Sequence, residues 1–216
     1  MAKVGLMTAF NSLYAPLAQI AVPIMEAYCK RHGYRLLVGE YHDRPGEENR
    51  MSRGDLCKPA MFLQHADDYD VLMWLDVDSI IMSHGFRIQD VLDGRDWLWT
   101  GNTDGPMSGF WIGRATPLVR AWVHRFAFAC AYEYGGGDQY AMREVAKWFP
   151  YDRLTGGDNI VYGREAGHCF APEVGAPEGL EKTIIYRPGD WIVTFPGLDI
   201  ARRIDLMAQY AAKVVI

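Results

Sequence analysis

The sequence predicts one α/β domain in which a mixed, mainly parallel sheet is flanked by helices. Apolar runs of strand length alternate along the chain with longer segments of helical character, which is typical of sheets built from strand–helix–strand units. The chain has 216 residues, of which 50% are hydrophobic, and this suffices for one compact domain with a buried core. We therefore expect a single domain over residues 1–216.

The N-terminal segment predicts the first strand–helix–strand unit. Residues 3–10, KVGLMTAF, form an apolar run that predicts a buried strand. A helix is expected from about Tyr14 to Arg31, because basic residues fill its last turn and Gly33 follows it. Residues 34–40 then predict a second strand, and the polar, turn-rich segment 41–54 predicts a loop.

The third predicted strand ends on two aspartates. A helix is expected from about Asp55 to Ala66, and the continuous apolar run Val71–Leu75 after it is typical of a central strand. Asp76 and Asp78 follow directly, at the strand end where ligands bind in open α/β sheets. Two carboxylates one residue apart repel each other unless a cation lies between them, which a divalent metal with bound phosphate would supply. One aspartate capping a helix and the other in solvent is the alternative that this short motif leaves open.

A related string belongs to a different chemistry. Haloacid-dehalogenase-like phosphatases carry a strand ending in DxDx(T/V), whose first aspartate is the nucleophile. Here Ile80, which has no hydroxyl, stands at the fifth position, and the motif follows the third strand rather than the first. Both differences disfavour a phosphatase.

Composition disfavours several classes of protein. A net charge of -5 argues against a nucleic-acid binder, which usually carries a basic surface. The cysteines lack CxxC spacing, so they predict reduced packing residues rather than a zinc or redox motif. No apolar run approaches the ~18 to 20 residues of a membrane span, and the first strand begins almost at Met1. We therefore expect a soluble, cytoplasmic protein.

The C-terminal stretch Asp199–Val214 has apolar residues at helical spacing and a basic pair at Arg202 and Arg203. Packing against the domain or against a second subunit in a homodimer is the expected use of this helix. A peripheral position at a membrane surface is the alternative, although the number of basic residues is small.

Five segments that occur in a fixed order carry a family resemblance. They are MEAYCKRHGYRLLV (25–38), LCKPAMFLQHADDYDVLMWLDVDSII (56–81), MSGFWIGRATPLVRAWVHRF (107–126), GGDQYAM (136–142) and WIVTFPG (191–197). Together they resemble the galactosyltransferase, xylosyltransferase and mannosyltransferase family of plant and fungal polysaccharide synthesis, within the GT-A superfamily. The resemblance implies a Rossmann-like GT-A fold, with a nucleotide-binding half at about 1–82 and an acceptor-side half at about 83–216.

The resemblance also implies a reaction and its residues. A retaining transfer of a hexose or pentose is expected from a nucleotide-sugar donor, UDP being favoured over GDP, to a glycan or other hydroxyl acceptor. Asp76 and Asp78 would bind Mn²⁺ or Mg²⁺. Asp138 would bind sugar hydroxyls, and Gln139 would lie beside the anomeric carbon and stabilise its positive charge. The donor is expected to contact Thr8, Ala9, Phe10, Lys58, Asp76, Val77, Ser108 and Gly109.

Two positions depart from the family pattern. Many relatives carry a histidine as third metal ligand in a late HFxG phrase, where this chain has Thr194, so the metal is expected to bind weakly. Met107 stands where the family usually has an asparagine, so one expected donor contact is either absent or made by another residue, such as Asn102 or Asp104. His168 is a further candidate for the missing ligand. These departures support an alternative function, a catalytically silent nucleotide-sugar-binding or assembly subunit.

Overall fold

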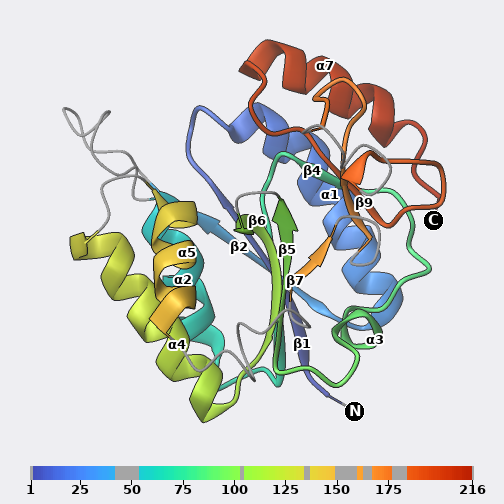
Figure 1. Cartoon of the computed structure of the whole chain (residues 1–216). Coiled ribbons are helices and arrows are strands. Elements are labelled where there is room, and N and C mark those ends of the chain that lie inside the picture. Colours follow the sequence, from blue (N-terminus) through green and yellow to red (C-terminus); the bar gives the residue numbers. More distant parts are fainter. Residues whose placement is uncertain are drawn as a thin grey trace.

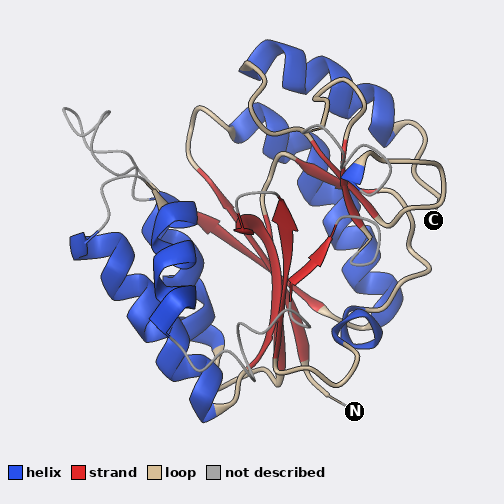
Figure 2. Ribbon diagram, viewed as in Figure 1, coloured by secondary structure: helices blue, strands red, loops and turns tan. Residues whose placement is uncertain are grey.

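The computed structural model describes residues 2–41, 54–102, 105–133, 137–148, 160–162, 167–176 and 184–215. In this part of the chain a six-stranded sheet lies between two layers of helices (Figure 1, Figure 2). Its strands, in spatial order, are β2 (Arg35–Glu40), β1 (Val4–Phe10), β3 (Val71–Leu75), β6 (Gly105–Arg114), β5 (Trp97–Asn102) and β7 (Ile160–Tyr162). The expected first three strands are confirmed to within one residue, whereas most of the expected loop 41–54 lies outside the described residues.

The helices divide between the two faces of the sheet. On one face lie α2 (Gly54–His65), α4 (Pro117–Phe128) and α5 (Asp138–Trp148), with the π-helical turn η1 (Ala129–Glu133) after α4 (Figure 1). On the other face lie α1 (Ala15–His32), α3 (Ile88–Leu92) and α7 (Ile200–Ala211). The helices expected near residues 14–31, 55–66 and 199–214 are therefore present, and the C-terminal one packs against α1 of its own domain.

Sheet pairing is mixed, as the sequence predicts. β1 pairs in parallel with both β2 and β3, and β5 pairs in parallel with β7. The long strand β6 runs antiparallel to β3 and β5, with Leu75 opposite Phe110. This register continues past the end of β3, where the Asp76 backbone N–H donates to the Gly109 carbonyl at 2.9 Å. The antiparallel strand thus places the Ser108–Gly109 segment beside the first aspartate.

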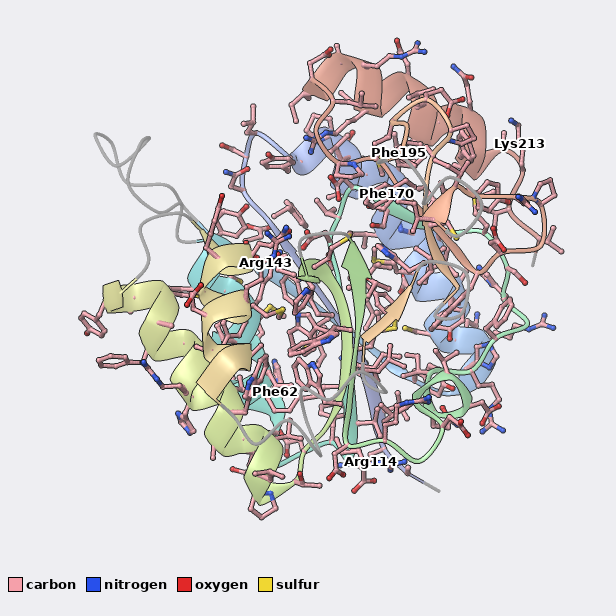
Figure 3. The ribbon with its side chains drawn as sticks, in the orientation of Figure 1. Phe62, Arg114, Arg143, Phe170, Phe195 and Lys213 are labelled. Carbon is pink, nitrogen blue, oxygen red and sulfur yellow. The ribbon has the colours of Figure 1, made fainter. Side chains whose placement is uncertain are left out.

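Two hydrophobic cores fill the space between the sheet and its helix layers. Successive side chains of β1 enter opposite cores, Leu6 toward α1 and Met7 toward α2, as the two-residue period of a strand requires. The core on the α2 side contains a tryptophan cluster in which the rings of Trp97 and Trp111 are 4.8 Å apart. Figure 3 shows Phe62 in this layer. Trp97 and Trp111 are therefore buried core residues rather than exposed sugar platforms.

A small second sheet lies beside the second aspartate. It consists of β4 (Ser79–Ile81), β9 (Ile192–Thr194) and β8 (His168–Phe170), in that order. β4 begins one residue after Asp78 and pairs antiparallel with β9, so that Ser79 faces Thr194. Phe195, labelled in Figure 3, directly follows β9, and its ring lies 5.3 Å from that of Tyr210 in α7. The arrangement brings a C-terminal strand and helix to the loop that follows β3.

None of the described helices is both long and apolar enough to span a bilayer. The cysteines are free thiols, three of them buried and Cys57 partly buried, in agreement with the packing role that the sequence predicts.

Candidate functional site

Asp76 is fixed at the end of β3 by several donors. Its Oδ1 accepts a hydrogen bond from Trp74 Nε1 at 2.7 Å. The Lys58 ammonium lies 2.9 Å from Oδ1 and 3.1 Å from Oδ2. A side chain with these contacts is neither a helix cap nor a freely solvated carboxylate, so the alternative left open at this position is excluded for Asp76.

Lys58 joins two distant acidic residues. It projects from α2, and its Nζ forms ion pairs with Asp138 Oδ2, at 2.6 Å, and with Asp76. The Ser108 hydroxyl also lies 3.5 Å from Nζ. Burial alone would lower the pKa of Lys58, but the Asp138 and Asp76 carboxylates outweigh it and raise the pKa above its ordinary value. The buried ammonium is therefore charged at neutral pH and holds the end of β3 to the start of α5.

Asp138 is the first residue of α5. Gly137 precedes it with a positive φ of 95°, and its carbonyl accepts from the Ala141 N–H, which closes the first turn. The Asp138 side chain is 14% exposed and points to Lys58. Gln139 follows in the same turn and is partly buried. Lys58 therefore links the start of α5, with Asp138 and Gln139, to Asp76, although Asp76 and Asp138 are 62 positions apart in the chain.

Gly109 provides room for the Asp76 carboxylate. A Cβ at this position would lie 3.0 Å from Asp76 Oδ2, closer than ordinary packing allows. The family resemblance implies that the donor contacts Gly109. The structure gives a separate reason for a glycine here, which is the space that Asp76 needs.

Asp78 is held by a residue that sequence reasoning did not place in the site. Its Oδ2 ion-pairs with Arg203 Nη1 of α7 at 3.1 Å, and the two side chains are 13% and 12% exposed. Burial and the nearby Asp76 charge raise the pKa of Asp78 to about 6, against the opposing effect of Arg203. The backbone carbonyl of Asp78 accepts the N–H of Phe195 at 3.0 Å, which anchors the loop to β9.

A signal for Arg203 exists in the sequence. Arg203 stands on the same helical stripe as Leu206, Met207 and Tyr210, which are all buried. A charged residue on the apolar stripe of a helix needs a buried partner, and Asp78 is that partner. The neighbouring Arg202 lies off the stripe and is exposed.

Thr194 is at the position that the family resemblance assigns to a metal-binding histidine. Its hydroxyl accepts from the Ser79 hydroxyl at 3.0 Å and lies 3.4 Å from the Asp78 carbonyl oxygen. His168 is not brought to this point. It is opposite Ile192, two residues before Thr194, its ring stacks on Phe110, and burial lowers its pKa to about 3.

The remaining predicted residues line the strand ends nearby. Thr8 and Ala9 are buried at the end of β1 and Phe10 is partly buried, while Val77 is buried between the two aspartates. Within the described part of the chain the Thr8 hydroxyl has no hydrogen-bond partner. Met107 is buried. Asp104 and the side chain of Asn102 fall outside the described residues.

The net charge at the two aspartates is compatible with a bound divalent cation. Three carboxylates, those of Asp76, Asp78 and Asp138, meet two cations, Lys58 and Arg203, which leaves one negative charge in excess. Carboxylate oxygens suit Mn²⁺ and Mg²⁺. Among the residues that the structure describes, no group of three or more His, Cys, Asp or Glu side chains is placed to hold a metal. In this part of the chain the fit therefore rests on the two aspartates, and the metal stays a prediction.

Comparisons with known proteins show the fold. No protein-family model matches the chain, and no curated protein matches its sequence. A solved glycosyltransferase involved in the glycosylation of the major capsid of PBCV-1 is 15% identical, with a TM-score of 0.74 over 96% of this chain and 99% of that one. The bifunctional glycosyltransferase WbbM has a TM-score of 0.65 at 12% identity; the match covers 99% of this chain and 50% of WbbM.

A third structure, the galactosyltransferase LgtC in complex with donor and acceptor sugar analogs, has a TM-score of 0.55 at 10% identity, over 98% of this chain and 96% of LgtC. Identities this low carry no information on substrate or mechanism. The specific plant and fungal family stays a prediction. The α/β architecture is confirmed: the chain has the fold of these glycosyltransferases.

Proposed function

We propose that the chain is a glycosyltransferase that moves a hexose or pentose from a nucleoside-diphosphate sugar to a hydroxyl group of a glycan or similar acceptor. The observation that carries the proposal is the buried ion-pair cluster of Asp76, Lys58 and Asp138 at the carboxyl end of the sheet. It lies where open α/β sheets bind their ligands, on a fold shared with glycosyltransferases. UDP is the favoured nucleotide, and GDP is the alternative.

Each part of the cluster has a task in such a reaction. Lys58 holds Asp138 in one orientation, so that its carboxylate is ready to accept hydrogen bonds from sugar hydroxyls. Gln139, the next residue, offers its amide oxygen to the anomeric carbon as positive charge develops there. Asp76 and Asp78 would hold a divalent cation, which as a Lewis acid stabilises negative charge on the departing diphosphate.

The proposed transfer retains the anomeric configuration. The acceptor oxygen bonds to the anomeric carbon on the face from which the diphosphate oxygen departs. The acceptor's hydroxyl proton passes to that departing oxygen, so charge and atoms balance without a protein base. Gln139 stabilises charge and forms no covalent bond, because an amide is a poor nucleophile.

Nucleotide-dependent thermal stabilisation tests the donor part of the proposal. The unfolding midpoint is measured with UDP and with GDP, each with Mn²⁺ and with EDTA, because a ligand that binds only the folded state raises it. We expect UDP with Mn²⁺ to give the largest shift. Release of free sugar or of UDP from a panel of UDP-sugars then tests turnover, with D138N as the variant that should abolish it.

The alternative is a nucleotide-sugar-binding subunit without catalysis. One observation favours it: the Thr194 hydroxyl is engaged with Ser79 and the Asp78 backbone, so it replaces the expected histidine with a structural group. Nucleotide binding without turnover for any donor, and with an unchanged affinity in D138N, would support this alternative over the transferase.

A further inference from the structure

The Arg203 guanidinium has hydrogen-bonding capacity that its protein contacts do not use. A guanidinium offers five N–H donors in a planar fork. Nη1 donates to Asp78 Oδ2 at 3.1 Å, and Nε donates to the Leu198 carbonyl at 2.7 Å. For Nη2 no partner is seen among the described residues. The side chain is 12% exposed, and Nη2 is not among the fully buried unpartnered atoms, so this end of the guanidinium is reachable from solvent.

The position of the guanidinium is fixed from several sides. The Nε contact ties it to the chain just before α7, and its central carbon lies 5.8 Å from the centre of the Tyr14 ring, near the end of β1. Asp199 caps α7 by accepting the Arg202 N–H at 2.9 Å. A cation that is held in place in this way loses little conformational entropy when a ligand binds to it.

The two buried cations of the site, Lys58 and Arg203, differ in how many carboxylates already pair with them. Lys58 lies between two carboxylates at 2.6 and 2.9 Å, with Ser108 at its third side, so its charge is already balanced. Arg203 meets a single carboxylate, and that carboxylate is also repelled by Asp76. An anion that binds at this edge of the sheet will therefore pair with Arg203 rather than with Lys58.

We propose that Arg203 binds the diphosphate of the donor through the Nη2 end of its guanidinium while it keeps its contact with Asp78. The inference rests on the proposed function and assigns to Arg203 the donor contact that the sequence predicts for Lys58. The planar fork suits phosphate oxygens, to which arginine binds in a bidentate manner. Arg203 would thus make the C-terminal helix a part of the donor site.

The experiment compares binding of UDP, GDP, inorganic pyrophosphate and uridine by calorimetry, in wild type and in R203Q. We expect R203Q to weaken binding of pyrophosphate and of the preferred nucleotide by at least about tenfold, the usual effect of losing a charged hydrogen bond. Uridine has no phosphate, so its affinity should stay unchanged. The matched control is R202Q, which removes the exposed neighbouring arginine and should bind every probe as the wild type does.

Each outcome decides the inference. Wild-type affinity of R203Q for pyrophosphate and nucleotide overturns it, and so does an equal loss of affinity for uridine. If R203Q does not fold, R203K replaces it: lysine keeps the charge but not the fork, so diphosphate binding should fall several-fold, and wild-type affinity overturns the inference. A wild-type protein that binds none of the phosphorylated probes contradicts the proposed function itself, and this inference with it.

Discussion

The Lys58 ammonium lies 2.6 Å from the Asp138 carboxylate, and this ion pair joins α2 to the first turn of α5. The same ammonium reaches Asp76 at 2.9 Å, so one buried cation connects two acidic segments that are far apart in the sequence. Both carboxylates therefore keep their orientation before any ligand binds. Preorganisation of this kind is what a site for oriented sugar transfer requires.

Replacement of Lys58 by methionine should destabilise the fold strongly. Methionine retains most of the packing volume but leaves the Asp138 and Asp76 carboxylates close together without their cation. Breaking a buried ion pair by removing one partner costs about 3–5 kcal/mol. Urea unfolding at pH 7 checks this. A loss below about 1 kcal/mol would show that Lys58 has no structural role and is available for donor contact alone.

Gly109→Ala should disturb the site more than the fold. The new Cβ would lie 3.0 Å from Asp76 Oδ2 and push the carboxylate off its position, while overpacking of this kind costs about 1–3 kcal/mol in stability. We expect weaker nucleotide binding, measured by calorimetry. Gly85→Ala is the matched control, because its nearest neighbour, the Ser83 hydroxyl oxygen, is at an ordinary 3.6 Å. Equal nucleotide affinity in the two variants would argue against Gly109 as a site residue.

Much of the fold is predictable from local patterns in the sequence. The strand β3 is a run of apolar residues ending in aspartates, and Gly33 has the positive φ of 69° that its place after α1 predicts. The partners of the site charges are harder to predict, because they depend on tertiary packing. The sequence links Lys58 to the donor, whereas the structure pairs its charge with Asp76 and Asp138.

Arg203 is a second residue whose partner in the site cannot be predicted from local sequence patterns. Its basic neighbour Arg202 makes the pair look like a surface cluster, and only the helical register places Arg203 on the stripe of Leu206 and Tyr210. Knowledge that α7 packs against α1 and β4 is needed to connect it to Asp78, 125 positions earlier. Long-range charge pairing of this kind has no local pattern in the chain.

Asp78 should make the stability of the metal-free protein depend on pH between about 4 and 6. Its pKa in the folded state is raised from 3.8 to about 6, so the folded protein binds a proton that the unfolded chain has already lost. The contribution of this group is therefore most favourable at low pH and falls as the pH rises through that window, by on the order of 3 kcal/mol at most. Asp78→Asn removes the titration.

Urea unfolding in EDTA at pH 4, 5, 6 and 7 measures this contribution as the difference between wild type and D78N. The wild type should lose stability relative to D78N as the pH rises to about 6, and the difference should then level off. If the difference in unfolding free energy is constant across the pH series, Arg203 fully compensates the burial of Asp78, and the pKa of Asp78 is ordinary.

The Thr194 hydroxyl should contribute to stability and not to metal affinity. It accepts from Ser79 at 3.0 Å and lies 3.4 Å from the Asp78 carbonyl oxygen in a buried position. Thr194→Val keeps the shape but leaves the Ser79 hydroxyl without this partner, at a cost of about 1–3 kcal/mol. Thr194→Ser, which keeps the hydroxyl, is the control and should lose less stability.

Urea unfolding measures the loss of stability, and Mn²⁺ titration with nucleotide present should give equal metal affinities for wild type and T194V. A marked loss of Mn²⁺ affinity in T194V together with retention in T194S would instead make the hydroxyl a metal ligand in place of the histidine.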